Sequence, residues 1–138
     1  MGSKKQTLQQ QRAKHALEQV KTALQTYQNN KEHREKFVST AENMPASILI
    51  NGLGQTIATL RAQAKGKQQE DPHMAIYYAL QGWLCKNGLE SPYPAAANLL
   101  EAIVEGDRRS YKHAQAESLA YLEWFKKFAV AFLKRPEE

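Results

Sequence analysis

Four histidines and one cysteine are the first side chains to consider as metal ligands or nucleophiles in this chain. No histidine has a second histidine or cysteine three or four residues away, which is the spacing typical of helical metal sites. The histidines are His15, His33, His73 and His113. Cys85 lies in the apolar run GWLCKNGL without a recognisable base partner, so we expect it to be a small buried hydrophobic residue. The sequence therefore predicts no catalytic residue and no metal site.

The segment 51–54, NGLG, is rich in glycine like a phosphate-binding loop, but it lacks the lysine and the spacing of a P-loop. The serines lie outside any nucleophile-elbow context. Most acidic residues fall at expected helix starts or alternate with lysine along helix faces, where capping and surface pairing explain them. We therefore expect a protein that is not an enzyme and uses no cofactor.

Basic residues are the better candidates for a function. The chain has 19 Lys and Arg against 14 Asp and Glu, giving a net charge of +5, and its pI is near 9.3. Such an excess favours a polyanionic partner. The basic residues recur in every long segment, as Arg12/Lys14/Lys21, Arg61/Lys65/Lys67, Arg108/Arg109/Lys112 and Lys126/Lys127. This distribution indicates several basic patches on a folded surface and not a disordered basic arm.

Arg108, Arg109 and Lys112 fall in the first two turns of an expected helix, where positive charge opposes the helix dipole. Asp107, the expected N-cap, offsets only part of this cost. Binding of phosphate oxygens would explain the cluster, since guanidinium groups and helix N-terminal amides both favour anions. A solvated basic face explains it equally well, and the sequence leaves both interpretations open.

The segment EWFKKFAVAFL places Trp124 about 100° around the helix from Phe125. Phe125, Phe128 and Phe132 share one face and are expected in the core. Trp124 is therefore available for packing within the bundle, for a protein interface or for stacking beneath a base. The first two are favoured.

Every long segment carries apolar residues at helical spacing, and none alternates over the length of a strand. The sequence predicts helices over residues 7–28, 32–65, 72–86, 95–105 and 108–135, with Asp71 and Asp107 as N-caps. We expect an all-α fold, a single-domain bundle of five to six helices over residues 7–135, preceded by a flexible N-terminus at residues 1–6. An N-terminus without an apolar signal core, and the lack of any membrane-length apolar run, predict a soluble cytoplasmic protein.

The second helical segment is expected to be bent. Its apolar stripe passes Pro45 and the pair Asn51-Gly52, all of which tend to interrupt helices. The stripe consists of Phe37, Ala41, Met44, Ile48, Leu49, Leu53, Ile57, Leu60 and Ala64. A buried face that continues across such residues predicts a curved helical element. On the fourth helix we expect a buried face made by Leu99, Leu100, Ile103 and Val104.

Four segments of the chain, in this order, resemble a known family: QRAKHALEQV, ILINGLGQTIATL after a Met-Pro step, YYALQGWL, and ESLAYLEWFKKFAVA. The family is the small all-helical subunit, the fifth-numbered protein, of the type III-B CRISPR effector called the Cmr complex. The resemblance covers about residues 9–134, and INGLGQ with the EWFKKFA-type last helix is its most specific part. Met44 stands where the family usually has leucine, and segment 66–72 follows no pattern of the family.

This resemblance implies a non-catalytic subunit of an RNA-guided, RNA-targeting complex in antiviral defence. Copies of such subunits stack head to tail beside the backbone subunits and line the groove where target RNA pairs with the guide RNA. The implied partners are the backbone subunits, the large polymerase-like subunit, further copies of the same chain, and both RNAs. On this basis the expected RNA-binding residues are Arg12, Lys14, Lys21, Arg61, Lys65, Arg108, Arg109 and Lys112.

Head-to-tail stacking needs two complementary surfaces, which we expect near the bend at residues 45–52 and on the last helix, with Leu53 and Trp124 at subunit interfaces. Two alternatives stay open. A purely structural subunit would hold its neighbours together without touching RNA. A helix-turn-helix DNA regulator would need base-reading side chains at the start of a recognition helix. The segment Arg108-Arg109-Ser110 matches that requirement only weakly.

Overall fold

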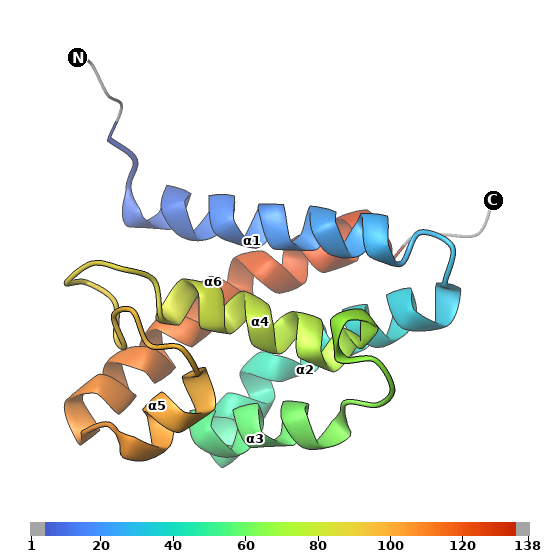
Figure 1. Ribbon diagram of the computed structural model, residues 1–138. Coiled ribbons are helices and arrows are strands. Elements are labelled where there is room, and N and C mark those ends of the chain that lie inside the picture. Colours follow the sequence, from blue (N-terminus) through green and yellow to red (C-terminus); the bar gives the residue numbers. More distant parts are fainter. Residues whose placement is uncertain (1–4, 135–138) are drawn as a thin grey trace.

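The structure, a computed structural model, describes residues 5–134, which contain six α-helices and one short 3₁₀ turn (Figure 1). They are α1 (Leu8–Thr26), α2 (Lys31–Asn51), α3 (Leu53–Gln63), η1 (Gln68–Glu70), α4 (Pro72–Leu84), α5 (Leu99–Glu105) and α6 (Arg108–Leu133). No strand occurs within residues 5–134, so the predicted all-α class with a long last helix is confirmed. Residues 1–4 of the expected flexible N-terminus, and the expected helix end at 135, lie outside the described residues.

Polar side chains begin two of these helices where the sequence predicts them. The Asp71 carboxylate accepts hydrogen bonds from the backbone N–H groups of His73 and Met74, at 2.7 and 3.3 Å, at the start of α4. The Asp107 carboxylate accepts one from Ser110 at 2.8 Å at the start of α6. Both predicted N-caps are confirmed, and each satisfies N–H groups that the first helical turn leaves without a partner.

The long helix α6 packs against α1 on one side and α2 on the other. Figure 1 shows α1 along one edge of the molecule and α3 with α5 along the opposite edge, with α4 and α6 between them. The core surrounds the fully buried Phe125, whose ring centre lies 5.5 Å from that of Phe37 on α2. Phe128 and Phe132, which the sequence also placed in the core, are only half-buried at its border.

The second helical segment is two helices and not one bent helix. α2 continues past Pro45 to Asn51, and α3 begins at Leu53 after the single residue Gly52. The predicted change of direction at Asn51-Gly52 is therefore confirmed, whereas Pro45 does not end the helix. Proline has no N–H group to donate to the carbonyl of Ala41, and the helix tolerates that loss.

Two residues that were expected to be buried are exposed. Leu49, from the stripe of the second helical segment, is 71% exposed, and Val104, from the expected face of the fourth helix, is 74% exposed. Leu49 follows the fully buried Ile48 and so lies about 100° around the helix from the stripe. α5 has seven residues and begins only at Leu99, so it buries a narrow stripe made by Leu99 and Ile103. α4 also ends earlier than predicted, at Leu84, before the pair at 87–88.

α6 fixes the backbone of the α2–α3 elbow, which we define as residues 51–54. Gly52 has φ 86° and ψ 160°, a conformation that is almost exclusive to glycine. It also leaves the start of α3 without a side-chain cap. Instead the Leu53 N–H donates to Gln115 Oε1 at 2.9 Å, and the Gly54 N–H donates to the Tyr111 hydroxyl at 3.0 Å.

We expect Gly52→Ala to lower the free energy of unfolding by roughly 1–3 kcal/mol. Alanine is strained at this positive φ, and its Cβ would lie 3.0 Å from the Tyr111 hydroxyl. Gly54→Ala is the matched control, because its Cβ would meet Ile103 at an ordinary 3.5 Å and alanine favours helices. Denaturant unfolding followed by circular dichroism measures both. Equal losses for the two variants would contradict the backbone conformation of the elbow.

Candidate functional site

Arg108, Arg109 and Lys112, which we call the α6 basic cluster, are all exposed on the first turns of α6. Together with Asp107 they border a shallow depression on the surface. Hydrogen bonds from Ser110 hold the pKa of Asp107 below its usual value, so this carboxylate is engaged as a cap. Among residues 5–134 no ion pair joins the cluster to an acidic side chain, and its three charges face solvent.

The other predicted cations do not join this cluster. Lys14 and Lys21 are exposed on α1. Arg61 lies in the last turn of α3 and Lys65 lies two residues beyond that helix, and α1 and α3 lie at opposite edges of the molecule (Figure 1). The Arg61 guanidinium lies 5.0 Å from the centre of the Tyr77 ring, a cation–π contact that holds it on the protein surface. The predicted RNA-binding residues therefore fall in separate places.

Arg12 is the predicted RNA-binding residue whose placement disagrees most with that role. Its guanidinium forms a two-pronged ion pair with Glu117 on α6, with Nη2 donating to Oε1 at 2.9 Å and Nε donating to Oε2. Trp83 Nε1 of α4 donates to the same Oε2 at 2.8 Å. Burial by itself would raise the pKa of Glu117. The hydrogen bonds from Arg12 and Trp83 stabilise the carboxylate more strongly than burial destabilises it, so the pKa of Glu117 lies below its usual value. Glu117 therefore joins three helices, and Arg12 is not a free surface cation.

His15 extends this polar contact between α1 and its neighbours. Its Nδ1 lies 2.7 Å from the hydroxyl of the buried Tyr121, and its ring packs at 5.6 Å against Trp83. Burial lowers the pKa of His15, because the charged imidazolium loses its hydration there. No local pattern in the sequence indicated this cluster, since its members lie on three helices that are far apart in the chain.

The two expected interface residues, Leu53 and Trp124, differ in how far they are buried. Leu53 is fully buried in the core, so its side chain is not on the surface that a neighbouring subunit could touch. Trp124 is half-buried, and its Nε1 donates to Gln9 Oε1 at 3.0 Å while its ring packs against Phe128. Cys85 is buried as expected, and burial raises the pKa of its thiol to about 11.

Leu49 and Ile50, an exposed apolar pair on the last turn of α2, were not recognised as a pair in the sequence. They are 71% and 79% exposed, directly before the elbow. A signal for them was present, because Ile48, Leu49 and Ile50 are consecutive. Three consecutive residues span about 200° of a helix, so they cannot all face one core.

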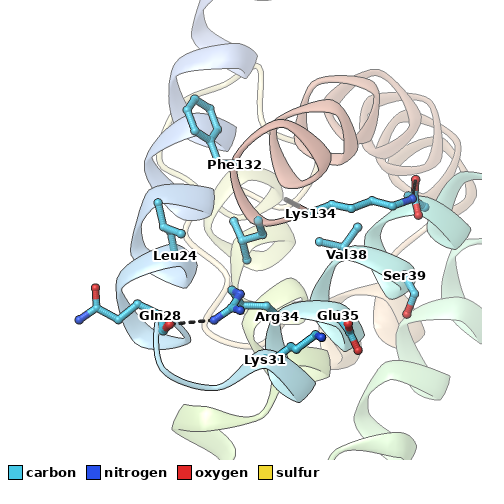
Figure 2. Close-up of a pocket in the computed structure, with 11 residues that line it drawn as sticks. Leu24, Gln28, Lys31, Arg34, Glu35, Val38, Ser39, Phe132 and Lys134 are labelled. Carbon is cyan, nitrogen blue, oxygen red and sulfur yellow. Dashed lines mark hydrogen bonds and ion pairs between the residues drawn. The ribbon is translucent and has the colours of Figure 1, made fainter. Parts of the chain in front are cut away.

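A groove of about 570 Å³ lies at the other end of the molecule, where α1 and α6 end and α2 begins. Figure 2 shows Leu24 and Phe132 on one side of this groove and Val38 on the other. Arg34 reaches across its base and donates to the carbonyl oxygens of Tyr27 and Gln28, at 3.0 and 2.8 Å. The arginine thus closes the end of α1 against α2.

Residues 5–134 hold no group of three or more His, Cys, Asp and Glu side chains placed to bind one metal ion. In the same part of the chain, no helix combines the length and the apolar character needed to cross a bilayer.

Comparison with known proteins identifies the family. Residues 8–132 match the family model described as CRISPR-associated protein (Cas_Cmr5). The fold is similar to the X-ray crystal structure of a CRISPR-associated Cmr5 family protein from Thermus thermophilus, with a TM-score of 0.70 and 26% sequence identity over 93% of this chain and 99% of that one. The chain belongs to the Cmr5 family, the small structural subunit of the type III-B CRISPR Cmr complex.

The partly buried imidazole of His15 makes stability depend on pH. Because the folded-state pKa of His15 lies below the 6.5 of the unfolded chain, the unfolded state takes up the proton first. We therefore expect the free energy of unfolding to fall as the pH drops below about 6.5. His15→Gln should reduce this decline in urea titrations at several pH values. His113→Gln, at an exposed position on α6, is the control, and parallel curves for wild type and His15→Gln would contradict the assignment.

Proposed function

We propose that this subunit lies along the guide–target RNA duplex of the Cmr complex and holds the target through non-specific phosphate contacts made mainly by the α6 basic cluster. Three exposed cations at the N-terminal end of a helix, without an ion-pair partner in the described part of the chain, carry this proposal. They oppose the helix dipole, so folding alone does not favour them, whereas a bound phosphate would use both the cations and the helix amides.

Contacts of this kind suit a complex in which base pairing with a guide reads the sequence. The protein then needs only to recognise the shape and the backbone of the RNA. Lys14, Lys21, Arg61 and Lys65 would add weaker contacts from other parts of the surface. Each subunit binds RNA weakly by itself, and copies that stack beside the backbone subunits multiply the weak contacts through effective concentration.

A second role, assembly with neighbouring subunits, is favoured by the exposed pair Leu49 and Ile50. Large apolar side chains exposed side by side are typical of protein interfaces more than of a free surface. The pair lies beside the elbow, within the region where the sequence predicts a stacking surface. Trp124 stays a candidate for the other surface, and Leu53 acts only indirectly, because it packs inside the fold.

Neutralising the α6 basic cluster should weaken target-RNA binding by the assembled complex. For Arg108→Gln, Arg109→Gln and Lys112→Gln combined, we expect the slope of log affinity against log salt to fall by up to about 2, since each phosphate contact contributes about 0.7. Lys126→Gln with Lys127→Gln on the same helix is the control, because both lysines pair with Glu123. Filter binding over a salt series measures the slopes. An unchanged slope in the triple variant would remove the cluster from the RNA site.

Leu49→Ser with Ile50→Ser should reduce incorporation of this subunit into the complex while changing its free energy of unfolding by no more than about 0.5 kcal/mol. Both side chains contribute little to the core, so the loss would lie in the interface. Native mass spectrometry of complexes purified through a backbone subunit measures incorporation. Leu89→Ser, at a fully exposed leucine between α4 and α5, is the control. Normal incorporation of the double variant would exclude the pair from the interface.

A further inference from the structure

A polar groove of about 300 Å³ lies between α2 and α3, on the inner side of the elbow. We call it the α2–α3 groove. Met44 and Leu60 are buried beneath it, and His73 at the start of α4 borders it. Figure 1 shows α2 and α3 beside each other below α4.

Most of the side chains along this groove are amides and hydroxyls, and the others are Lys36, Met44, Leu60 and His73. Asn43 and Asn51 contribute amides from α2 and Gln63 contributes one from α3, and none of the three has a hydrogen-bond partner among the described residues. Lys36 is the first α2 residue that lines the groove, and it adds a positive charge there. Within residues 5–134 no carboxylate borders the groove. The lining therefore offers many donors and acceptors and favours an uncharged or anionic ligand over a cation.

Thr56 is the observation that points to a ligand. Its side chain lines the groove, the residue is 5% exposed, and its hydroxyl has no hydrogen-bond partner within the described chain. One turn later the Thr59 hydroxyl donates to the carbonyl oxygen of Gln55 at 2.9 Å, as threonine commonly does in a helix. A buried hydroxyl without a partner is costly, and most such groups in native proteins are satisfied. A ligand in the groove would supply the missing partner.

We propose that the α2–α3 groove binds one unpaired nucleotide of the target RNA. Asparagine and glutamine amides are suited to hydrogen-bond the edge of a base, and hydroxyl groups such as Thr56 are suited to a ribose 2′-hydroxyl. Lys36 is suited to a phosphate. The volume is at the low end of the ~300–1,000 Å³ typical of small-ligand sites, which matches a single nucleotide better than a peptide or a helix.

The position of the groove fits this ligand, and the inference rests on the proposed function that the subunit contacts target RNA. Asn51 at one end of the groove directly precedes Gly52, and a Cβ on Gly52 would lie 3.0 Å from the Tyr111 hydroxyl. Tyr111 is the neighbour of Lys112 in the α6 basic cluster. Hydrogen bonds from the elbow to Tyr111 and Gln115 thus connect one end of the groove to the helix that carries the cluster.

Thr56→Val provides the sharpest test, because it removes the hydroxyl and keeps the shape of the side chain. We expect pentauridylate, titrated into the isolated chain, to shift NMR resonances of α2 and α3. Thr56→Val should weaken the binding of pentauridylate at least threefold. The free energy of unfolding should not fall, because the variant removes an unsatisfied buried group. Thr22→Val on the exposed face of α1 is the matched control. Asn43→Ala with Asn51→Ala should weaken binding in the same way.

The same titration separates this inference from the proposed function. The triple variant of the α6 basic cluster should lose salt-dependent affinity but keep the shifts on α2 and α3. Pentadeoxyuridylate should bind the groove less tightly than pentauridylate, because it lacks the 2′-hydroxyl. If the triple variant weakens binding but Thr56→Val and the double asparagine variant leave the affinity unchanged, the nucleotide site alone is overturned. A lack of binding at either surface, in the isolated chain and in the assembled complex, would overturn both.

Discussion

The first turn of α3 must find hydrogen-bond acceptors elsewhere in the fold, because Gly52 precedes it and has no side chain to cap it. α6 supplies them through the Gln115 amide oxygen and the Tyr111 hydroxyl. Backbone N–H groups that lose both water and a protein partner are costly. These two bonds therefore fix the direction in which α3 leaves α2. They also make the elbow and the first turns of α6 one structural unit.

Three surface features meet at this unit. The pair Leu49 and Ile50 lies on the turn before the elbow, the α2–α3 groove opens between the helices that the elbow joins, and the α6 basic cluster flanks Tyr111. A different elbow angle would move all three relative to one another. The segment NGLG therefore sets the angle between α2 and α3. It is not a phosphate-binding loop, because it lacks the lysine of a P-loop. The polar contacts around Glu117 act separately, because they attach α1 to α4 and α6.

The features that the sequence predicted correctly are local. Asp71 and Asp107 cap N–H groups that lie two and three residues further along the chain. The helical spacing of apolar residues and the change of direction at Gly52 likewise depend on residues that are close in sequence. The features it missed join distant segments. Arg12 and Glu117 are 105 residues apart, and nothing near either residue specifies the other. The α2–α3 groove was equally hidden, because its polar stripes become a groove only after the elbow brings two helices together.

Arg12 also shows why counting basic residues overestimates a nucleic-acid surface. Positive charge in the sequence does not distinguish a cation that faces solvent from one that neutralises a buried carboxylate, as Arg12 does for Glu117, or one held over a ring, as Arg61 is over Tyr77. The α6 basic cluster differs because its position on a helix is itself unfavourable. Cations placed against a helix dipole, without an ion-pair partner in the described chain, are better candidates for binding an external anion than cations that are already paired. That criterion is stricter than net charge, and in this chain it selects Arg108, Arg109 and Lys112 from the larger basic set.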